Sequence, residues 1–325
     1  MKIASYGAGA IGGYLGVQLA LAGEDVTLIA RGPHLAAMKR DGLKLKIEGE
    51  TRVAHPFCTE DPAEAGPQDY VIIALKAHSV PAVAAKMMPL FGPETAVVTA
   101  QNGIPWWYFY GLEGPWRDRR IESVDPGGVL WDTLRPERAI GCVVYASTEI
   151  VAPGVVEHLS SNRFQLGEPD GSKSARGERL SKAMAKAGFK APLRPNIRDE
   201  IWLKLLGNAS FNPISVLTHA TLEQMVNDDG VRPVVAALMG EAKAVGEALG
   251  ANFGLEIETR IRRAGEVGAH KTSMLQDLEA KRPMELDALV ASIVELGDLT
   301  NVPTPFLHAV LALARLRGRT AGCPV

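Results

Sequence analysis

The stretch that decides the fold is "KIASYGAGAIGGYLGVQLALAGEDVTLIAR", residues 2–31. An apolar run at 2–6 comes first, followed by a glycine-rich turn, a helical pattern that ends at Gly23, and a segment at 24–30 that is predicted to be a second strand. A G-x-G-x-x-G turn between a first strand and a helix is typical of dinucleotide-binding α/β units. The sequence therefore predicts an N-terminal Rossmann domain built on a mainly parallel sheet.

The glycine-rich turn supplies the candidate phosphate site. Its first glycine permits a tight turn, its second lets a pyrophosphate approach the backbone, and its third lets the helix pack close to the sheet. The N-terminus of the following helix adds free N–H groups and a positive dipole. The predicted cofactor-binding residues of this turn are Gly7, Ala8, Gly9, Ala10, Ile11 and Gly12.

The end of the second strand selects the nucleotide. An NAD site favours an acidic side chain there, because a carboxylate accepts a hydrogen bond from the ribose 2′-hydroxyl. This chain has Ala30 followed by Arg31, and a guanidinium binds a 2′-phosphate in a bidentate manner. We therefore expect NADP(H), unless Arg31 is only a surface residue that opens the next turn.

Two polar residues follow later strands of the same predicted sheet. Lys76 comes directly after the apolar run at 70–75, and Asn102 follows the run at 95–100. Ligands of open α/β sheets bind at the carboxyl ends of the strands. Lys76 is therefore a candidate contact to cofactor phosphate or ribose, and Asn102 is a candidate contact to nicotinamide, ribose or substrate.

The composition argues against several classes of function. The 325 residues carry a net charge of −2, which gives no electrostatic footprint for nucleic acid. No apolar run has the length and character of a membrane span. The cysteines, Cys58, Cys142 and Cys323, lack the spacing of a disulfide framework or a zinc site, so no metal is expected and the pattern suits a cytoplasmic protein. Cys323 is expected to be an exposed thiol near the end of the chain.

Residues 104–135 form an aromatic segment that holds four of the five tryptophans and shows no clean hydrophobic period. Its Gly and Pro content predicts an inserted loop or flap. Two interpretations are open: its aromatics cover a ligand or partner, or they fold into a small core of their own. Beyond it, apolar runs at 139–147, 154–159 and 163–166 predict short strands added in antiparallel fashion.

From residue 196 onward the pattern is almost entirely helical, which predicts a Rossmann-type domain over 1–195 and an all-α domain over 196–325. The first of these helices carries Lys204, Asn208 and Asn212, spaced four residues apart. That spacing puts a cation and two amides on one helix face. Such a face is either a solvated stripe or the wall of an active site.

Two residues of later helices are further candidates. Ser273 has the S-x-x-Q spacing of a capping box and is expected to open a helix. Glu285 is expected inside a helix that Pro283 starts. Other predicted helices lie near 232–249, 256–267 and 304–315.

These motifs together resemble the ketopantoate reductases (2-dehydropantoate 2-reductases), over nearly the whole chain. The matching pieces are "GAGAIGG" at 7–13, Arg31, "LKA" at 75–77, "QNG" at 101–103, "WLKLLGNASFNP" at 202–213 and "TSMLQDLEAKRPMELD" at 272–287. Many oxidoreductases share the glycine motif, whereas the lysine–asparagine helix and the segment at 272–287 are far more specific.

The resemblance implies NADPH-dependent reduction of a 2-keto acid to a 2-hydroxy acid. The best candidate is 2-dehydropantoate, reduced to pantoate in pantothenate biosynthesis. It also implies that NADPH and the keto acid bind between the two domains. Gly7, Gly9 and Gly12 then correspond to the pyrophosphate turn, Arg31 to the 2′-phosphate ligand and Lys76 to a further cofactor contact.

The resemblance also implies roles for the other polar residues. Lys204 falls on the catalytic lysine, and an ammonium there can polarise a ketone and protonate the alkoxide that hydride transfer leaves. Glu285 falls beside it as a second catalytic residue and would favour the charged lysine. The residues that would hold substrate or cofactor, or orient the lysine, are Asn102, Asn208, Asn212 and Ser273.

Two departures from the family pattern keep the substrate open. The aromatic segment at 104–135 is longer than its expected counterpart, and His78-Ser79 follows "LKA" in place of an aromatic–polar pair. The alternatives are a bulkier or more apolar 2-keto acid, a related hydroxyacid or opine-type dehydrogenase that uses NADP, and a non-catalytic NADP(H) sensor. A homodimer is also compatible with the sequence, because exposed aromatics suit a dimer interface.

Overall fold

The computed structural model describes residues 1–324 and divides them into two compact units. Unit 1 comprises Met1–Gln101, Pro105–Arg120 and Asp125–Ile197. Unit 2 comprises Asn102–Ile104, Ile121–Val124 and the residues from Arg198 onward. Unit 2 therefore takes two short segments from the N-terminal half of the chain.

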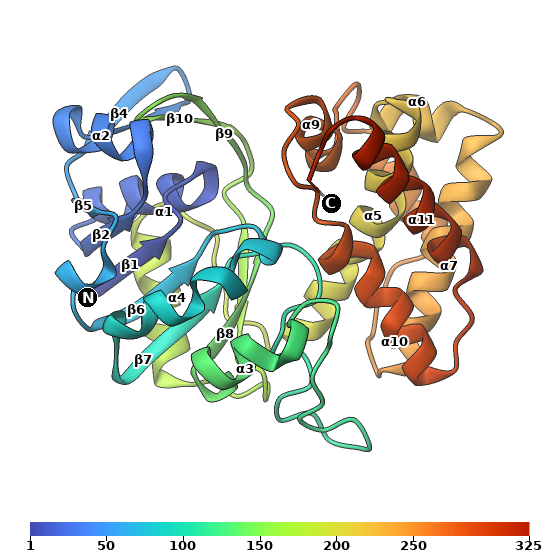
Figure 1. Ribbon diagram of the computed structural model, residues 1–325, viewed down its shortest axis with the longest axis horizontal. Helices are drawn as coiled ribbons and strands as arrows, with labels where there is room; N and C mark the ends of the chain where they lie inside the picture. Colours follow the sequence, from blue (N-terminus) through green and yellow to red (C-terminus); the bar gives the residue numbers. More distant parts are fainter. Residues whose placement is uncertain (325) are drawn as a thin grey trace. The chain divides into compact units, whose positions relative to one another are not determined.

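A seven-stranded sheet forms the centre of unit 1 (Figure 1). Its strands are β1 (Lys2–Tyr6), β2 (Asp25–Ile29), β5 (Phe57–Thr59), β6 (Gln68–Ile73), β7 (Phe91–Thr99), β8 (Ala139–Val144) and β11 (Phe164–Gly167). Their order is β11-β8-β7-β6-β1-β2-β5, and only the β11–β8 pair is antiparallel. The predicted α/β fold with a mainly parallel sheet is confirmed.

A second, four-stranded sheet in unit 1 has the order β4-β3-β10-β9. Its strands are β3 (Leu43–Ile47), β4 (Glu50–Ala54), β9 (Ser147–Ala152) and β10 (Val155–Ser160). The prediction that all strands after residue 139 are antiparallel additions is wrong for β8, which pairs in parallel with β7. It is wrong in part for β10, which pairs in parallel with β3 and antiparallel with β9. Parallel neighbours need a long crossover connection. The aromatic segment supplies it, and so it is the β7–β8 crossover instead of an inserted flap.

The helices of unit 1 are mostly short. The α-helices are α1 (Ala10–Leu21), α2 (Gly32–Asp41), α3 (Val129–Leu134) and α4 (Ala175–Lys186). The 3₁₀ segments are η1 (Pro62–Glu64), η2 (Ala77–Ser79), η3 (Pro81–Leu90), η4 (Pro126–Gly128) and η5 (Pro136–Arg138). The crossover between β7 and β8 contains η4, α3 and η5, while its first part consists mainly of turns.

Unit 2 is helical, as predicted. Its helices are α5 (Ile197–Thr218), α6 (Leu222–Asn227), α7 (Val231–Ala248), α8 (Ile257–Gly265), α9 (Ser273–Glu279), the π-helix η6 (Asp287–Ala291), α10 (Ser292–Thr300) and α11 (Pro305–Thr320). Trp202, Leu205 and Ala209 are buried on α5, which makes it a core helix. Cys323 is 5% exposed, and its Sγ donates to the Leu278 carbonyl at 3.6 Å. The expectation of an exposed tail thiol is therefore wrong.

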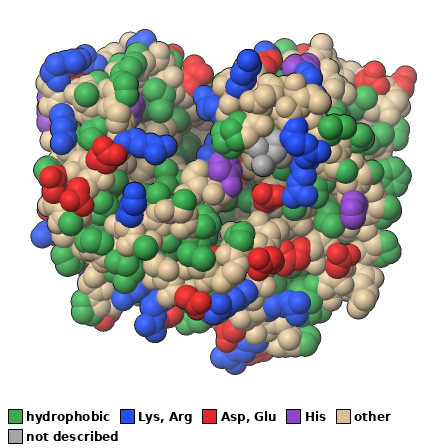
Figure 2. Space-filling model, viewed as in Figure 1, with side chains coloured by type: hydrophobic (Ala, Val, Ile, Leu, Met, Phe, Trp, Pro, Cys, Tyr) green, Lys and Arg blue, Asp and Glu red, His purple; other side chains and the backbone are tan. Residues whose placement is uncertain are grey.

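No helix within residues 1–324 combines the length and apolar character needed to cross a membrane. Figure 2 shows basic and acidic side chains interspersed over the face in view.

The contact between α1 and β1 depends on the missing side chain of Gly12. A Cβ at this position would lie 2.2 Å from the Gly7 carbonyl oxygen and 2.6 Å from Ser5 Oγ. The Ser5 hydroxyl also donates to the Gly12 carbonyl at 3.1 Å, so the strand and the helix touch directly. The glycine turn can form only because the third glycine of the motif leaves this space.

Gly12→Ala should therefore destabilise the protein by about 1–3 kcal/mol, the usual cost of forcing a methyl group into a packed site. Gly9→Ala is the matched control, because nothing lies within 4 Å of a Cβ built there. Urea unfolding of both variants measures the difference. A Gly12→Ala protein as stable as Gly9→Ala would contradict this account of the turn.

Candidate active site

The glycine turn has open backbone donors at the start of α1. Gly9 precedes the helix without a side-chain cap, and the N–H groups of Gly7 and Ala8 donate to the Ile29 carbonyl at 3.1 and 3.0 Å. These two bonds hold the turn to the end of β2. The first-turn N–H groups beyond them are the donors that an anion at a helix N-terminus uses. The turn therefore fits a pyrophosphate.

Arg31 lies two residues after the end of β2, at the N-cap position of α2. Its side chain is exposed, and within residues 1–324 its guanidinium makes no hydrogen bond or ion pair. A guanidinium that is not committed to the protein suits a 2′-phosphate ligand. The same observation suits a surface residue, so the NADP assignment stays a prediction.

Lys76 occupies the carboxyl edge of the parallel sheet. It follows β6 as the N-cap residue of η2 and is half-buried. The Gln101 amide donates to the Leu75 carbonyl at 2.8 Å and so joins the ends of β6 and β7 at this edge. Lys76 thus has the placement that the sequence predicted, although its contact with a cofactor is untested.

Lys204, Asn102 and Glu285 form one hydrogen-bonded chain within unit 2. Lys204 Nζ donates to Asn102 Oδ1 at 2.6 Å, and Asn102 Nδ2 donates to Glu285 Oε2 at 3.4 Å. Glu285 is only 7% exposed, and Lys204 is half-buried. The neutral amide of Asn102 therefore connects a cation to a carboxylate, a contact that the sequence did not predict in this form.

The position of Asn102 is fixed by its neighbour Gly103, which packs against the π-helix η6. The Ile104 N–H donates to the Ala288 carbonyl at 3.0 Å. A Cβ on Gly103 would lie 2.2 Å from that same carbonyl oxygen, and Gly103 has a φ of +91°. Short π-helical turns are frequent at functional sites. Sequence reasoning missed the role of Gly103, for which the third letter of "QNG" was the available signal.

Glu285 does not lie inside a helix that Pro283 starts. It precedes η6, and its carbonyl accepts the Leu289 N–H at 3.1 Å. Residues 282–285 have no regular secondary structure, since the chain leaves α9 through Lys281 with a φ of +53°. The expected helix thus begins later than Pro283, and Glu285 occupies its entrance.

Ser273 begins α9, but Thr272 caps it. Thr272 Oγ1 accepts the Leu275 N–H at 3.2 Å and lies 2.5 Å from the Ser215 hydroxyl on α5. Thr272 is buried, whereas Ser273 is exposed. The capping box predicted for Ser273 is therefore wrong, because the adjacent threonine caps the helix and ties it to α5. The Ser273 hydroxyl is not used by the cap.

The two asparagines of α5 differ in burial. Asn212 is 4% exposed, and its Nδ2 is buried without a hydrogen-bond partner among residues 1–324. Asn208 is half-buried, and its amide makes no hydrogen bond within the same residues. An unpaired buried N–H costs free energy, so a donor of this kind is suited to a ligand oxygen. A solvated stripe does not explain the buried Asn212.

The aromatic segment builds a core of its own in unit 1. Trp106, Trp107, Tyr108 and Phe109 are buried, and Trp107 Nε1 donates to Thr99 Oγ1 at 3.0 Å. A Cβ built on Gly141 would lie only 2.9 Å from the Trp107 ring, so the ring packs directly against β8. These aromatics anchor the crossover to β7 and β8, which favours the core interpretation over a ligand cover.

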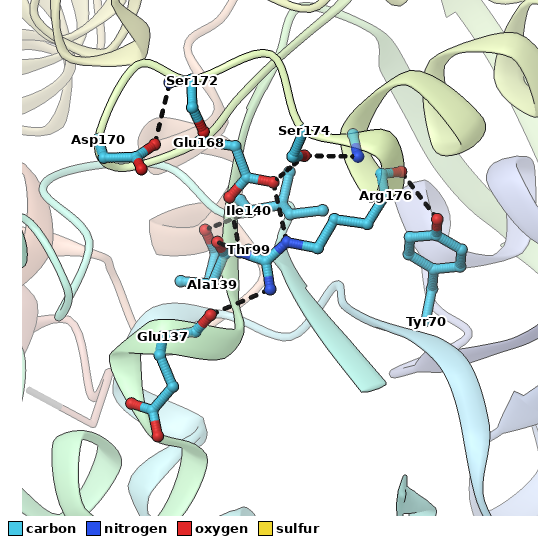
Figure 3. Close-up of polar contacts among 11 residues, drawn as sticks. Tyr70, Thr99, Glu137, Ala139, Ile140, Glu168, Asp170, Ser172, Ser174 and Arg176 are labelled. Atoms are coloured by element: carbon cyan, nitrogen blue, oxygen red, sulfur yellow. Dashed lines mark hydrogen bonds and ion pairs between the residues drawn. The ribbon is translucent and has the colours of Figure 1, made fainter. Parts of the chain in front are cut away.

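A second polar cluster lies at the amino edge of the same sheet (Figure 3). Arg176 donates to both carboxylate oxygens of Glu168, at 2.8 and 2.6 Å, and to the carbonyls of Glu137 and Ala139 at 3.0 and 3.2 Å. The hydrogen bonds to Glu168 raise the pKa of Arg176 above its usual value. Ser174 caps α4 and also donates to Glu168. This buried ion pair fastens α4 to β8 and β11.

A cavity of about 610 Å³ adjoins this cluster and is lined by arginines among other residues. Arg135 donates to Glu137, Arg138 donates to three backbone carbonyls, and Arg179 donates to the Tyr70 hydroxyl. Glu94 and Glu137 line the cavity as well. The arginines that line the cavity are thus engaged in hydrogen bonds within unit 1. Within the described residues no group of three or more His, Cys, Asp or Glu side chains is arranged to hold a metal.

The chain matches proteins of one family over nearly its whole length. The ketopantoate reductase PanE/ApbA family matches residues 3–171, and the ketopantoate reductase PanE/ApbA C-terminal family matches residues 196–318. The 2-dehydropantoate 2-reductase of Mesorhizobium japonicum is 51% identical over 99% of both chains. The alignment therefore includes the aromatic segment, which is not peculiar to this protein.

Solved structures agree with the sequence comparison. A crystal structure assigned as a ketopantoate reductase from Ralstonia solanacearum has a TM-score of 0.95 at 42% identity, over 99% of both chains. D-Mandelate dehydrogenase, solved with NADH and anilino(oxo)acetate, shares the fold with a TM-score of 0.85 at 21% identity, over 100% of both chains. The chain therefore belongs to the ketopantoate reductase family, nicotinamide-dependent oxidoreductases that act on CH–OH groups.

Proposed function

We propose that this chain uses NADPH to reduce 2-dehydropantoate to pantoate, a step of pantothenate biosynthesis. The observation that carries the proposal is the hydrogen-bonded chain of Lys204, Asn102 and Glu285. Reduction of a ketone needs a positioned proton donor. Lys204 would be this donor, with Asn102 to orient it and Glu285 to favour its charge. The 51% identical Mesorhizobium relative, which carries the name of this reaction, supports the choice of substrate.

Unit 1 has the groups that NADPH requires. The N–H groups at the start of α1 would bind the pyrophosphate, and Arg31 would bind the 2′-phosphate through paired N–H donors. Lys76 would contact phosphate or ribose at the carboxyl edge of the sheet. When bound, NADPH supplies the hydride that reduces the carbonyl carbon, while the protein provides placement and electrostatics.

Lys204 is the proposed general acid. Its ammonium polarises the substrate carbonyl and donates a proton to the oxygen on which negative charge develops. Asn102 Oδ1 accepts from the ammonium and directs it without removing its proton, because an amide oxygen is a weak base. Glu285, which accepts from Asn102, would supply a negative charge that favours the protonated lysine.

Neutral donors are proposed to hold the substrate. The Asn212 Nδ2 group is buried and unpaired within residues 1–324, so a carboxylate or hydroxyl oxygen of the substrate would satisfy it. Asn208 lies one turn away on the same helix, and the Ser273 hydroxyl is exposed at the start of α9. Amides and a hydroxyl bind a carboxylate without adding charge beside Lys204.

The decisive experiment measures NADPH oxidation by the purified protein with three 2-keto acids: 2-dehydropantoate, a straight-chain aliphatic acid and an aromatic acid. The highest kcat/KM is expected for 2-dehydropantoate. A higher value for another acid would keep the reductase and change its substrate. No oxidation with any of them would overturn the proposal and favour a non-catalytic NADP(H)-binding protein.

Lys204→Ala should lower kcat by about 10²- to 10⁴-fold, the usual contribution of a general acid. Its affinity for NADPH should change little, because the proposed cofactor ligands are in unit 1. Lys243→Ala is a matched control, since Lys243 is a lysine of another helix of unit 2 that pairs with Glu247. Steady-state kinetics and NADPH titration test both variants. A fully active Lys204→Ala enzyme would require another proton donor.

Arg31→Ala should weaken NADPH binding about tenfold or more and leave NADH binding nearly unchanged, because only NADPH carries the 2′-phosphate. Lys39→Ala removes another exposed cation of the same helix and serves as the control. Fluorescence titration with each nucleotide gives the dissociation constants. Equal losses for NADPH and NADH would remove the 2′-phosphate role from Arg31.

The homodimer stays a prediction. The aromatics at 106–109, which the sequence offered for an interface, are buried in unit 1 and do not support it. We expect light scattering to give twice the chain mass of 34.8 kDa, the mass of a dimer. The mass of one chain would contradict this prediction.

A further inference from the structure

His34, on α2, joins two loops of unit 1 through its two ring nitrogens. Its Nε2 lies 3.0 Å from the carbonyl oxygen of Ala8 in the glycine turn. Its Nδ1 lies 3.0 Å from the backbone nitrogen of Gly154, in the turn between β9 and β10. Neither the motifs of the sequence nor the family resemblance singles out this histidine.

The two partners fix the protonation state of the ring. The Gly154 N–H is a donor, so Nδ1 must accept and therefore carries no proton. The Ala8 carbonyl is an acceptor, so Nε2 must carry the proton and donate. Both bonds are satisfied only by the neutral imidazole with hydrogen on Nε2. A second proton, on Nδ1, would break the bond to Gly154.

The Ala8 carbonyl matters because it belongs to the Ala8–Gly9 peptide. In a planar trans peptide the N–H points opposite to the C=O. By holding the Ala8 oxygen, His34 therefore aims the Gly9 N–H away from itself. The Ala8 N–H is held by Ile29 at 3.0 Å, so Ala8 is tied at both its N–H and its C=O. Nothing lies within 4 Å of a Cβ built on Gly9, which leaves space for a phosphate there.

We propose that His34 is a positioning residue for the nicotinamide cofactor: anchored by Gly154, its neutral ring holds the Ala8 carbonyl of the pyrophosphate turn, and protonation removes the Gly154 anchor and so loosens this hold. The inference rests on the proposed cofactor binding by unit 1. His34 lies on α2, the helix that Arg31 precedes as its N-cap residue. It contacts the pyrophosphate turn, however, and NADH and NADPH both have a pyrophosphate. Its effect therefore differs from that of Arg31, which concerns NADPH alone.

The surroundings of His34 agree with a neutral ring. Burial lowers the pKa of His34 below its usual value, while the bond to the Ala8 carbonyl opposes that shift, and no charged group is among the causes. Residues 7–9 and 152–155, which form the two turns against the ring, contain no titratable side chain. On α2 itself, the charged residues are Lys39, Arg40 and Asp41, with Arg31 at its N-cap. On the flanking strands β9 and β10 they are Glu149, Glu157 and His158.

The sign of the pH effect follows from the lowered pKa. The neutral form predominates above the ordinary histidine value, so the turn is held there. As the pH falls through the lowered pKa of the folded protein, His34 gains a proton and the bond to Gly154 is lost. The affinity for the cofactor should then fall over the same pH range in which His34 becomes protonated.

The test measures NADH binding by fluorescence between about pH 8 and about pH 5, a range that brackets the ordinary histidine value. NADH is the probe because it lacks the 2′-phosphate, which itself titrates near pH 6 in phosphomonoesters. The wild-type dissociation constant should rise about tenfold on acidification, as expected for the loss of one or two half-buried hydrogen bonds.

Two variants separate the contacts. His34→Gln has an amide N–H group for Ala8 and an amide oxygen for Gly154 and cannot be protonated, so it should bind NADH within about threefold of wild type at about pH 8 and show a flat profile. His34→Asn has the same amide on a side chain one methylene shorter, so it should reach Gly154 without reaching Ala8 and bind about tenfold more weakly throughout. His308→Gln, on the exposed side of α11, is the control and should keep the wild-type profile.

A wild-type measurement makes the test independent of variant folding. If protonation weakens binding, NADH must lower the pKa of His34 by the same factor, about one pH unit for a tenfold effect. The imidazole proton resonance, followed by NMR with and without NADH, reports this directly. An unchanged His34 titration, or a His34→Gln profile identical to wild type, overturns the proposal. A wild-type protein that binds neither nucleotide at about pH 8 instead refutes the proposed function.

Discussion

The close approach of α1 to β1 at Gly12 is the constraint on which unit 1 depends. The Gly7 carbonyl and the Ser5 hydroxyl occupy the space that a side chain at residue 12 would need. Because the helix starts so near the strand, its first N–H groups emerge at the carboxyl edge of the sheet. The adjacent Gly13 repeats the pattern on the other side, where a Cβ would meet Val156 of β10 at 2.9 Å. One helix thus positions the glycine turn and supports the second sheet.

In unit 2, three polar side chains from separate segments are joined by hydrogen bonds. Asn102 accepts from the Lys204 ammonium and donates to the Glu285 carboxylate. A neutral amide can contact a cation and a carboxylate at the same time, because it has both an acceptor and a donor. Asn102 therefore links α5 to the residue that precedes η6, and under the proposed function it would orient Lys204 while Glu285 favours the charged lysine.

The parts of the fold that the sequence predicted are those encoded locally. The glycine turn, β1, α1 and β2 follow from one stretch of about thirty residues, and the line of Lys204, Asn208 and Asn212 follows from helical spacing. The parallel pairing of β7 with β8 was not predicted, because it is a contact between strands separated by the aromatic segment. Two adjacent cap residues, Thr272 and Ser273, have nearly the same local signal, and burial against α5 decides between them.

Other features have no signature in a single sequence. The π-helix η6 packs against Gly103 and accepts a hydrogen bond from the Ile104 N–H, and this packing has no local sequence signal. The sequence analysis therefore put Glu285 inside a helix, whereas it precedes η6. His34 belongs to no motif, and its two contacts come from segments that are 26 and 120 residues away in the chain. Such contacts depend on tertiary geometry, which spacing along the sequence does not express.

The assignment of Asn102–Ile104 and Ile121–Val124 to unit 2 affects how the protein can be divided. Asn102 follows a strand of unit 1 in sequence, yet its hydrogen bonds are to Lys204 and Glu285. Residues 121–124 also belong with the helices, since Glu122 and Ser123 donate their N–H groups to Glu295 on α10. A fragment cut near residue 196 would therefore lack part of its own interior. The two halves are modules in sequence comparison but are interlaced in their covalent connectivity, so exchange of domains between relatives would have to carry these two segments with the helices.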